Sequence, residues 1–431
     1  MMKICIVGAG VVGSYLAQKL SQEGYDVAII DKDRKKIEEI QSQIDVAAYS
    51  CDAFDEECIG QLRDYDLFIV ATNKDEINLS VALMLKAIYG KDKVIVRVDK
   101  DILSKREIET FLGVEIVNTF NEIFKNVETF IHYPFITSIN ELETGKFVIF
   151  SYTVKRPDFL SNTKISDLKE IRDRIPFTVV LIERDGKPYL PSGNKVLLEG
   201  DTVYILTERE TLNELIKALN IQIKPVKTIT FLGMSRIGIS ILKKIYGRGL
   251  SIKVIEEDIQ LCESIASQFP DVMVLNGKIT DKHLLESEQV GGSDIIISSS
   301  YREDNILSCI LVKKLGAKKV IAIIENPEYE EIAQSLGIDI PIVSRKMIAR
   351  KVYKRIKHRG FIDIFELKEN IRIYELPVSE EIEDRKVSEI STGKFVILGV
   401  VRDNKMKMVS GEFLLKKGDK LIVLEIEETE E

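Results

Sequence analysis

Three glycines near the start of the chain have the spacing of a phosphate-binding loop. Gly8, Gly10 and Gly13 follow the apolar run 3–7 and lead into residues 14–17, which have the pattern of a helix. Unbroken apolar runs of this kind are typical of buried parallel strands. Gly8 allows a tight turn, Gly10 lets the backbone approach a pyrophosphate, and Gly13 lets the helix pack closely on the strand. The helix N-terminus then offers unpaired N–H groups to phosphates.

An acidic residue follows at the distance that a ribose contact requires. A second apolar run, 27–30, ends in Asp31, which lies 23 residues after Gly8. A carboxylate at this position can bind both ribose hydroxyls and repels a 2′-phosphate, so NAD is favoured over NADP. The pattern predicts an adenine-nucleotide site. The alternative is a glycine-rich turn that closes a Rossmann-like unit without a ligand.

Composition excludes several other classes of protein. The chain has 431 residues, of which 45% are hydrophobic, and its net charge of −8 argues against bulk nucleic-acid binding. No apolar run reaches the roughly 18 residues of a membrane span, so we expect a soluble protein. The five cysteines are an odd number without a C-x-x-C motif, so we expect buried, reduced thiols. The histidines share no ligand spacing, so neither a metal site nor a catalytic residue is predicted.

The elements that must position the loop alternate between strand and helix. After Asp31 the pattern predicts strands at 45–49, 67–70, 94–98 and 114–117, with helices between them. This alternation is typical of a doubly wound parallel sheet, whose ligands lie beyond the carboxyl ends of the strands. Asp52, Thr72 and Arg97 fall at or near those ends.

A β-rich segment follows, and then the whole pattern repeats. Gly233 and Glu256 lie 225 residues after Gly8 and Asp31, and a second β-rich segment ends the chain. The predicted fold is α/β, with two tandem Rossmann-like doubly wound parallel-sheet lobes, each followed by a small α+β lobe. The expected lobes span 1–137, 138–224, 225–360 and 361–431.

The motifs resemble those of a known family. The loop 6–13, Asp31, the segment 71–78, the pair Val96-Arg97 and the duplication are together similar to TrkA-type cytosolic subunits of Trk potassium uptake systems. Those proteins are tandem pairs of RCK units (regulators of potassium conductance), and the resemblance covers essentially the whole chain. It implies a non-catalytic subunit in which NAD(H), ATP or ADP changes the arrangement of the lobes and gates a channel.

The resemblance also implies roles for individual residues. Asp31 would bind the adenosine ribose, Arg97 would add positive charge, and Thr72 and Asn73 would lie at the end of the fourth strand. The phosphates would be held by Gly8, Ala9, Gly10, Val11 and Val12.

The adenine-side segment and the second copy both depart from the family pattern. Asp52 and Ala53 match a Gly-Asp-Ala-Thr stretch of the family, but Cys51 and Phe54 replace its first and last residues. In the second copy, Glu256 could still bind a ribose. However, Ser235 replaces the middle glycine, and its Cβ would crowd a pyrophosphate. We therefore expect one tight nucleotide site per chain.

The resemblance implies a location and partners as well. We expect a cytoplasmic protein held on the inner face of the cell membrane by a TrkH-like potassium-translocating subunit, and a homo-dimer or homo-tetramer. NAD(H) is the first expected ligand, ATP or ADP the second, and NADP is disfavoured. An NAD-dependent oxidoreductase is the main alternative, and a purely structural assembly protein is a third. Against an oxidoreductase, no proton-transfer group is evident near the nucleotide, since His132 lies at the edge between two lobes.

Overall fold

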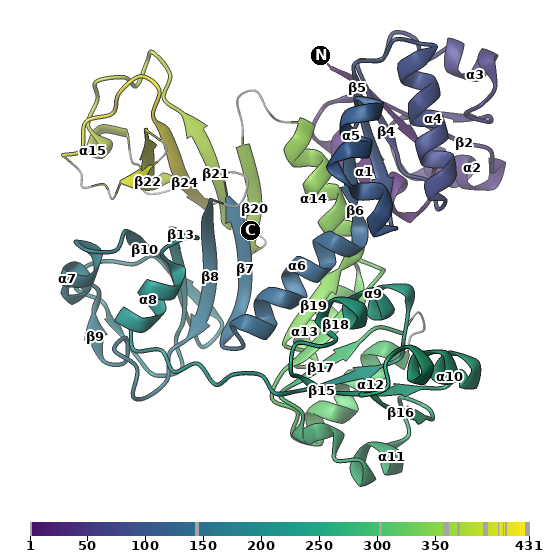
Figure 1. Ribbon diagram of the computed structural model, residues 1–431. Helices are drawn as coiled ribbons and strands as arrows, with labels where there is room; N and C mark the ends of the chain where they lie inside the picture. The colour runs from purple at the N-terminus through teal and green to yellow at the C-terminus, as the bar shows by residue number, and fades with distance from the viewer. Residues whose placement is uncertain are drawn as a thin grey trace. The chain divides into compact units, whose positions relative to one another are not determined.

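The computed structural model describes residues 2–142, 146–300, 304–356, 362–368, 371–390, 395–403, 405–407, 409 and 412–426. The chain divides into two compact units. The first unit consists of Met1–Thr129 and Val226–Tyr353, and the second of Phe130–Pro225 and Lys354–Glu431. Each unit therefore combines segments from both halves of the sequence (Figure 1).

The first unit contains two six-stranded parallel sheets. The first sheet has the order β3-β2-β1-β4-β5-β6, so the strand order reverses between β1 and β4. Its strands are β1 (Lys3–Val7), β2 (Asp26–Asp31), β3 (Ala47–Ser50), β4 (Leu67–Val70), β5 (Lys93–Val98) and β6 (Glu115–Asn118). Its helices are α1 (Val11–Gln22), α2 (Arg34–Gln43), α3 (Glu56–Gly60), α4 (Asp75–Ala87), η1 (Asp101–Ser104), α5 (Arg106–Leu112) and α6 (Thr119–His132).

Helices cover both faces of this sheet because its strands are apolar on both sides. Cys5 and Val7 of β1 pack in one buried cluster with side chains of α3 and α4. Their neighbours Ile4 and Ile6, also fully buried, point to the opposite face, since successive side chains of a strand alternate. The carboxyl ends of β1 and β4 lie side by side at the edge where the glycine loop leaves β1.

The second sheet repeats the first, with the order β16-β15-β14-β17-β18-β19. Its strands are β14 (Thr228–Leu232), β15 (Ser251–Glu256), β16 (Met273–Asn276), β17 (Ile295–Ser298), β18 (Val320–Ile324) and β19 (Ile340–Val343). Its helices are α9 (Arg236–Ile245), α10 (Ile259–Gln268), α11 (Lys282–Ser287), η4 (Val290–Gly292), α12 (Asp304–Lys314), α13 (Tyr329–Ser335) and α14 (Ser344–Ile356).

The second unit joins two five-stranded sheets through one core. The first sheet contains β7 (Ile136–Leu142), β8 (Phe147–Thr153), β10 (Phe177–Arg184), β11 (Lys187–Tyr189) and β13 (Thr202–Glu208). Its lobe adds β9 (Thr163–Lys164), η3 (Ile165–Leu168), α7 (Lys169–Arg172), β12 (Val196–Leu197) and α8 (Leu212–Ala218). The second contains β20 (Ile362–Lys368), β21 (Ile371–Pro377), β22 (Phe395–Arg402), β23 (Lys405–Lys407) and β24 (Lys420–Ile426), with α15 (Val387–Ile390).

Apolar side chains of both small sheets form this shared core. Phe147 and Leu206 of the first sheet belong to one buried cluster with Ile373 and Leu424 of the second. Hydrogen bonds also join the sheets, from the Thr178 hydroxyl to a carbonyl of β22 at 3.2 Å and from an amide of β23 to Glu208 at 3.0 Å. The two small lobes thus bury their apolar faces against each other.

The fold class predicted from the sequence is confirmed. The strand expected at 45–49 lies at 47–50 and the one expected at 114–117 lies at 115–118, so the edge strands begin later than predicted. The expected lobe boundary between residues 360 and 361 lies outside the described residues. In the part of the chain that the structure describes, no helix combines the length and apolar character that a membrane crossing needs.

The two small lobes repeat one buried ion pair. The Arg184 guanidinium donates to the Asp201 carboxylate at 2.7 and 2.8 Å, and Arg402 holds Asp419 in the same way at 2.7 and 2.6 Å. Burial alone would raise the pKa of Asp201, but hydrogen bonds from Arg184 and the Leu198 amide outweigh burial and lower it. The charged form of this carboxylate therefore stabilises the small lobe.

Asp201→Asn should lower the stability of the full chain by about 2 kcal/mol at pH 7, because it removes a charged hydrogen-bond acceptor that is almost fully buried. A carboxyl group whose pKa is lowered by folding stabilises above its unfolded pKa and loses that contribution as pH falls through the folded pKa. The difference from wild type should therefore shrink below about pH 4. Midpoints of urea unfolding at pH 7 and pH 3 measure this difference in stability. The variant Glu210→Gln, at an exposed position, is the control. An equal difference at both pH values would contradict this assignment.

Candidate functional site

The glycine loop adopts the geometry that its spacing predicts. Gly8 has a φ of +107°, and its amide donates to the Ile30 carbonyl at 2.8 Å. A Cβ at Gly13 would lie 1.9 Å from the Gly8 carbonyl oxygen, so only glycine lets α1 pack this closely on the loop. These two glycines are explained by the fold itself.

Gly10 is different, because the fold does not require a glycine there. Its φ is −78°, and an added Cβ would meet only the Asn73 side chain at an ordinary 3.5 Å. Gly10 is the N-cap of α1, and no side chain accepts a hydrogen bond from the first turn of this helix. The helix therefore begins with backbone N–H groups that are available to an anion.

Asp31 faces this helix start from the end of β2. Its Oδ2 accepts a hydrogen bond from the Ala9 amide at 2.8 Å, and its Oδ1 accepts one from the Asp33 amide at 2.9 Å. The side chain is half-buried. A carboxylate has about four lone-pair sites, so each oxygen can still accept a bond from a ribose hydroxyl.

A cavity of about 250 Å³ opens over these groups at the carboxyl ends of β1 to β4. Its lining includes seven of the residues predicted from the sequence: Gly8, Gly10, Asp31, Asp52, Ala53, Thr72 and Asn73. Ala9, Val11, Val12 and Gly13 belong to the same loop and helix start but do not line the cavity. The amides of Val11 and Val12 lie in the uncapped first turn of α1, whereas the Ala9 amide already donates to Asp31.

Three lysines at this cavity were not predicted. Lys32, Lys36 and Lys74 line it together with the carboxylates of Asp31 and Asp52. Part of the signal was present in the sequence, since Lys32 follows Asp31 directly and Lys36 lies in the first turn of α2, the next helix. The three cations and the start of α1 outweigh the two carboxylates, so the cavity favours an anionic ligand.

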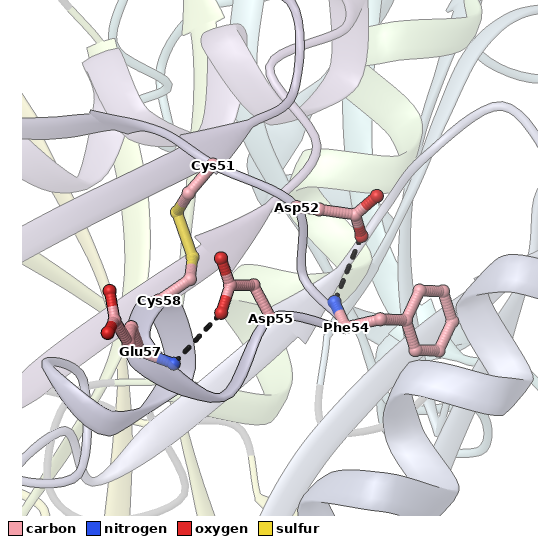
Figure 2. Close-up of a disulfide and its surroundings, with 6 residues drawn as sticks. All are labelled: Cys51, Asp52, Phe54, Asp55, Glu57 and Cys58. Atoms are coloured by element: carbon pink, nitrogen blue, oxygen red, sulfur yellow. Dashed lines mark hydrogen bonds between the residues drawn. A yellow bond between two sulfur atoms is a disulfide. The ribbon is translucent and has the colours of Figure 1, made fainter.

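The segment 51–54, expected from the sequence to contact adenine, closes one wall of the cavity. The Asp52 carboxylate accepts a hydrogen bond from the Phe54 amide at 3.0 Å and shapes the turn after β3 (Figure 2). Cys51 and Cys58 form a disulfide across this turn, with their Cα atoms 6.0 Å apart. The expectation that all five cysteines are reduced is therefore wrong, because the turn returns the chain to Cys51. Cys5, Cys262 and Cys309 are free and buried, as expected.

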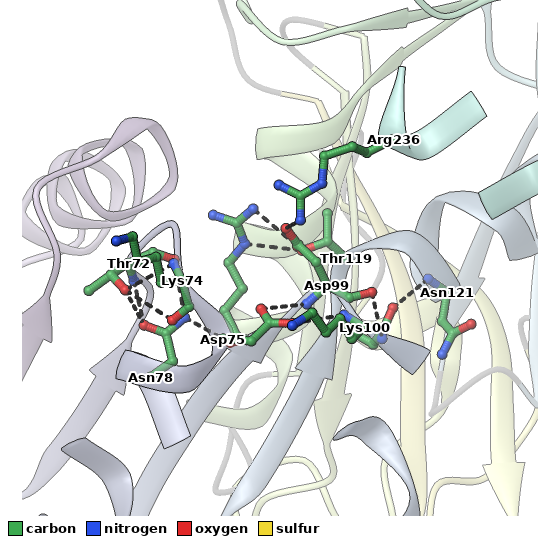
Figure 3. A network of polar contacts seen from close by, with 11 residues as sticks. Thr72, Lys74, Asp75, Asn78, Asp99, Lys100, Thr119, Asn121 and Arg236 are labelled. Atoms are coloured by element: carbon green, nitrogen blue, oxygen red, sulfur yellow. Dashed lines mark hydrogen bonds and ion pairs between the residues drawn. The ribbon is translucent and has the colours of Figure 1, made fainter. Parts of the chain in front are cut away.

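Buried polar side chains fix the strand ends on the other side of the cavity. Asn78, fully buried on α4, accepts the Thr72 amide at 2.9 Å and donates to the Arg97 carbonyl at 2.9 Å. The Asp75 carboxylate accepts the amides of Asp99 and Lys100, both at 2.9 Å (Figure 3). These contacts tie the start of α4 to the end of β5, and sequence reasoning did not predict them.

Arg97 is placed beside the cavity rather than in its lining. Its guanidinium donates to the Thr119 hydroxyl at 3.1 Å and pairs with the Asp99 carboxylate at 3.2 Å. The other oxygen of Asp99 lies 3.6 Å from the guanidinium of Arg236, at the start of α9 in the second lobe (Figure 3). Arg97 is thus held by a carboxylate that also contacts the repeated lobe.

The second copy retains the acidic residue, but a side chain caps the start of its first helix. Glu256 accepts the amides of Met234 and Asp258 at 2.7 and 2.9 Å, as Asp31 does with its own neighbours. Ser235, however, caps α9, because its hydroxyl accepts the Gly238 amide at 3.2 Å. The anion position that Gly10 leaves open is occupied here by a side chain of the chain itself.

The arrangement at the first lobe can bind an anion through the start of α1 and the lysines of the cavity. No histidine is among the described residues that line the cavity. Within the same described ranges, no three histidine, cysteine or carboxylate side chains gather as a metal site would require. The polar groups that remain suit recognition of a ribose and phosphates.

Comparison with known proteins agrees with the duplicated architecture. A model of the TrkA-N domain matches residues 4–117 and 229–344, and a model of the TrkA-C domain matches residues 149–220. A Trk system potassium uptake protein TrkA homolog of Archaeoglobus fulgidus is 29% identical, with 100% of this chain and 99% of the relative covered. The Trk system potassium uptake protein TrkA of Haemophilus influenzae is 23% identical, with 98% and 95% covered.

A solved structure shares the fold at lower identity. The GsuK channel bound to NAD superimposes with a TM-score of 0.64 and 16% identity, and the match covers 99% of this chain and 77% of that one. At this identity the similarity supports the fold alone.

Two neighbouring glycine substitutions should separate binding from folding. Gly10→Ala should leave stability nearly unchanged but weaken binding of ADP at least about tenfold, since its methyl group occupies the approach to the helix start. Gly13→Ala should destabilise the chain by about 1–3 kcal/mol, because its Cβ collides with the Gly8 carbonyl. Thermal unfolding and calorimetric titration of both variants measure this. Unchanged ADP affinity in Gly10→Ala would show that no phosphate approaches this residue.

Proposed function

The chain belongs to the TrkA-N domain family, and on that premise we propose that it is a nucleotide-sensing regulatory subunit of a Trk potassium uptake system. The proposed ligand is an adenine nucleotide bound at the first lobe, NAD(H) or ATP/ADP, with NADP disfavoured by Asp31. The open start of α1 opposite Asp31 carries this proposal, because neither the fold nor a neighbouring side chain accounts for it.

The nucleotide would be held through its shared adenosine diphosphate part. We assign the ribose hydroxyls to Asp31, the phosphates to the loop residues Gly8, Ala9, Gly10, Val11 and Val12, and the adenine side to Asp52 and Ala53. The amides of Gly10, Val11 and Val12 would donate to the phosphates, since those of Gly8 and Ala9 already donate to the Ile30 carbonyl and to Asp31. Thr72 and Asn73 line the same cavity and would bound the phosphates. Arg97 would supply charge from beside it, and Gly13 keeps the helix start in place.

A regulatory role requires the ligand to distinguish two arrangements of the protein. A nucleotide shifts such an equilibrium only by its difference in affinity, typically about 1–3 kcal/mol. The contacts of Asp99 with Arg97 and with Arg236 of the repeated lobe support such a link, because they begin beside the cavity. We propose that occupancy of the cavity changes this contact between the lobes and thereby gates the channel partner.

The proposed setting is the cytoplasmic face of the cell membrane, with a potassium-translocating, TrkH-like subunit as partner. Both curated relatives described above carry the name of the potassium uptake system. Co-purification of a potassium-channel subunit with the full chain tests this setting. Its absence under conditions that preserve membrane complexes would favour a purely structural assembly protein.

An NAD-dependent oxidoreductase is the competing function, and the filled second site argues against it. Hydride transfer gives no reason for a duplicated lobe whose helix start is capped by Ser235. Incubation of the protein with NADH and a panel of small carbonyl compounds distinguishes the two functions. Steady oxidation of NADH would favour the enzyme, and binding without turnover favours the sensor.

We expect one tight equivalent of adenine nucleotide per chain, and Asp31→Ala should abolish its binding in calorimetric titration. Glu256→Ala is the matched control, because it removes the same type of carboxylate-to-amide hydrogen bond from the second copy. This control should retain full affinity. Two equal tight equivalents in wild type would contradict the assignment of a single site.

Assembly into a homo-oligomer is supported by exposed apolar side chains on adjacent elements of the first lobe. Leu83, Ile88, Ile102 and Phe111 lie on or beside α4, η1 and α5, and Phe111 is 87% exposed. Exposed apolar residues in such a group are typical of an interface. The homologous helices of the second lobe expose Leu307, Ile332 and Leu336.

Phe111→Asp should therefore reduce the molar mass of the assembly in light scattering, because a desolvated carboxylate opposes association. Ile259→Asp, at an exposed site on α10 outside this group, is the control and should leave the mass unchanged. The same mass for Phe111→Asp and wild type would exclude this surface as the interface.

A further inference from the structure

A covalent bond closes the wall of the nucleotide cavity in the first lobe. Cys51 lines the cavity, and the disulfide to Cys58 encloses Asp52, Ala53 and Phe54, which line it too. We propose that Cys51 and Cys58 are a redox-modification site, at which exchange with small thiols and disulfides sets the affinity of the cavity for its nucleotide. This inference rests on the proposed nucleotide site and adds a second input to it.

The disulfide joins two anchored points across a short segment of the chain. The Cys51 amide donates to the Asp31 carbonyl at 3.0 Å, so one end is fixed to the strand that carries the ribose-binding carboxylate. Cys58 is 5% exposed and belongs to the core of the sheet. Between them, local hydrogen bonds of Asp52 and Asp55 and the five-residue helix α3 hold the chain (Figure 2). Reduction leaves these contacts, the backbone bond from the Asp55 amide to the Asp52 carbonyl and the packing of Ala53 on the core to shape the wall, without the covalent link to Cys58.

The repeat within the chain offers an internal comparison. The strand register places Gly277 at the position of Cys51, since Ser50 pairs with Asp31 and Asn276 with Glu256. The Gly277 amide donates to the Glu256 carbonyl at 2.9 Å, as the Cys51 amide does to the Asp31 carbonyl. Leu284 follows the helix cap Asp281 by three residues, as Cys58 follows Asp55. The second copy, whose helix start is capped, thus has glycine and leucine in place of the two cysteines. The disulfide accompanies the copy in which the anion position is open.

The two sulfur atoms differ in their exposure to small molecules, so a thiol is expected to attack one of them first. Cys51 is half-buried and faces the cavity, whereas Cys58 is buried. The thiolate of a small thiol attacks Sγ of Cys51, the bond to Sγ of Cys58 breaks, and Cys58 leaves as a thiolate that takes up a proton. A second thiol then attacks the small-molecule sulfur of the mixed disulfide and releases Cys51. Two small thiols become one small disulfide, and the protein gains two electrons and two protons. Oxidation by a small disulfide reverses these steps.

Binding and redox state must influence each other equally. If the oxidised protein binds nucleotide more tightly by some factor, saturating nucleotide must shift the thiol–disulfide equilibrium toward the disulfide by the same factor. A bound nucleotide also covers Cys51 and should slow its reduction. Cytosolic disulfides are usually transient and redox-sensing rather than structural, which agrees with a site that responds to its thiol environment.

The first test counts thiols in the full-length protein. After equilibration with oxidised glutathione, denaturation and alkylation, we expect the three thiols of Cys5, Cys262 and Cys309 to react, and all five cysteines after reduction. Peptide mass spectrometry identifies the linked pair. Five reactive thiols in the glutathione-treated protein would overturn the proposal, whatever the nucleotide measurements give.

The second test compares ADP binding to the oxidised and reduced protein by calorimetry. Reduction should weaken binding about fivefold or more, and ADP should shift the glutathione equilibrium by the same factor. The double variant Cys51→Gly with Cys58→Leu places the pair of the second copy in the first, and its ADP affinity should not respond to reductant. Equal affinity of both wild-type forms would overturn the redox role and leave the nucleotide site intact. Failure of both forms to bind ADP or NADH would instead reject the proposed function.

Discussion

The candidate site depends most on the start of α1, which follows β1 and carries no side-chain cap. Peptide dipoles converge there, and Gly10 contributes no side chain that would satisfy them. The Asp31 carboxylate accepts a hydrogen bond from the Ala9 amide and so holds the loop between β1 and α1 in place. In the repeated lobe the same position is closed by Ser235, with the rest of the sheet and the acidic residue preserved. Within one chain, the fold is thus seen with and without a space for an anion.

The surroundings of this position connect it to other parts of the molecule. Asn78 and Asp75 tie the end of β4 and the start of α4 to the end of β5, where Asp99 contacts both Arg97 and the repeated lobe. In the second unit, the two small sheets share one core and so join the two halves of the sequence. These contacts connect the cavity to the repeated lobe, as the proposed gating role requires.

Much of this could be predicted from the sequence, because its main features are periodic or repeated. The apolar runs and the glycine spacing are local patterns, and the acidic residues recur 225 positions apart. Together these patterns predicted both sheets and the duplicated lobes. Contacts between distant residues gave no such signal. The sequence could place Arg97 near a strand end but could not show that Asp99 and Thr119 hold its guanidinium.

The wall of the cavity formed by residues 51–54 shows the same limit of prediction from the sequence. Cys51 and Cys58 carry no recognised spacing, and only the turn of the chain brings them together. The shared core of the small lobes depends on which faces meet, and alternation within a strand cannot specify that. Lys32 and Lys36, in contrast, lie directly after Asp31 and in the first turn of the next helix, and this nearness could have been used.

The central claim is that one adenosine diphosphate group lies over the start of α1, and a crystal structure of the full chain with ADP tests it most directly. The account predicts a single nucleotide per chain, with its ribose hydroxyls at Asp31 and its phosphates on the amides of Gly10, Val11 and Val12. A nucleotide at the Gly233 loop with equal occupancy, or phosphates bound away from the start of α1, would contradict it.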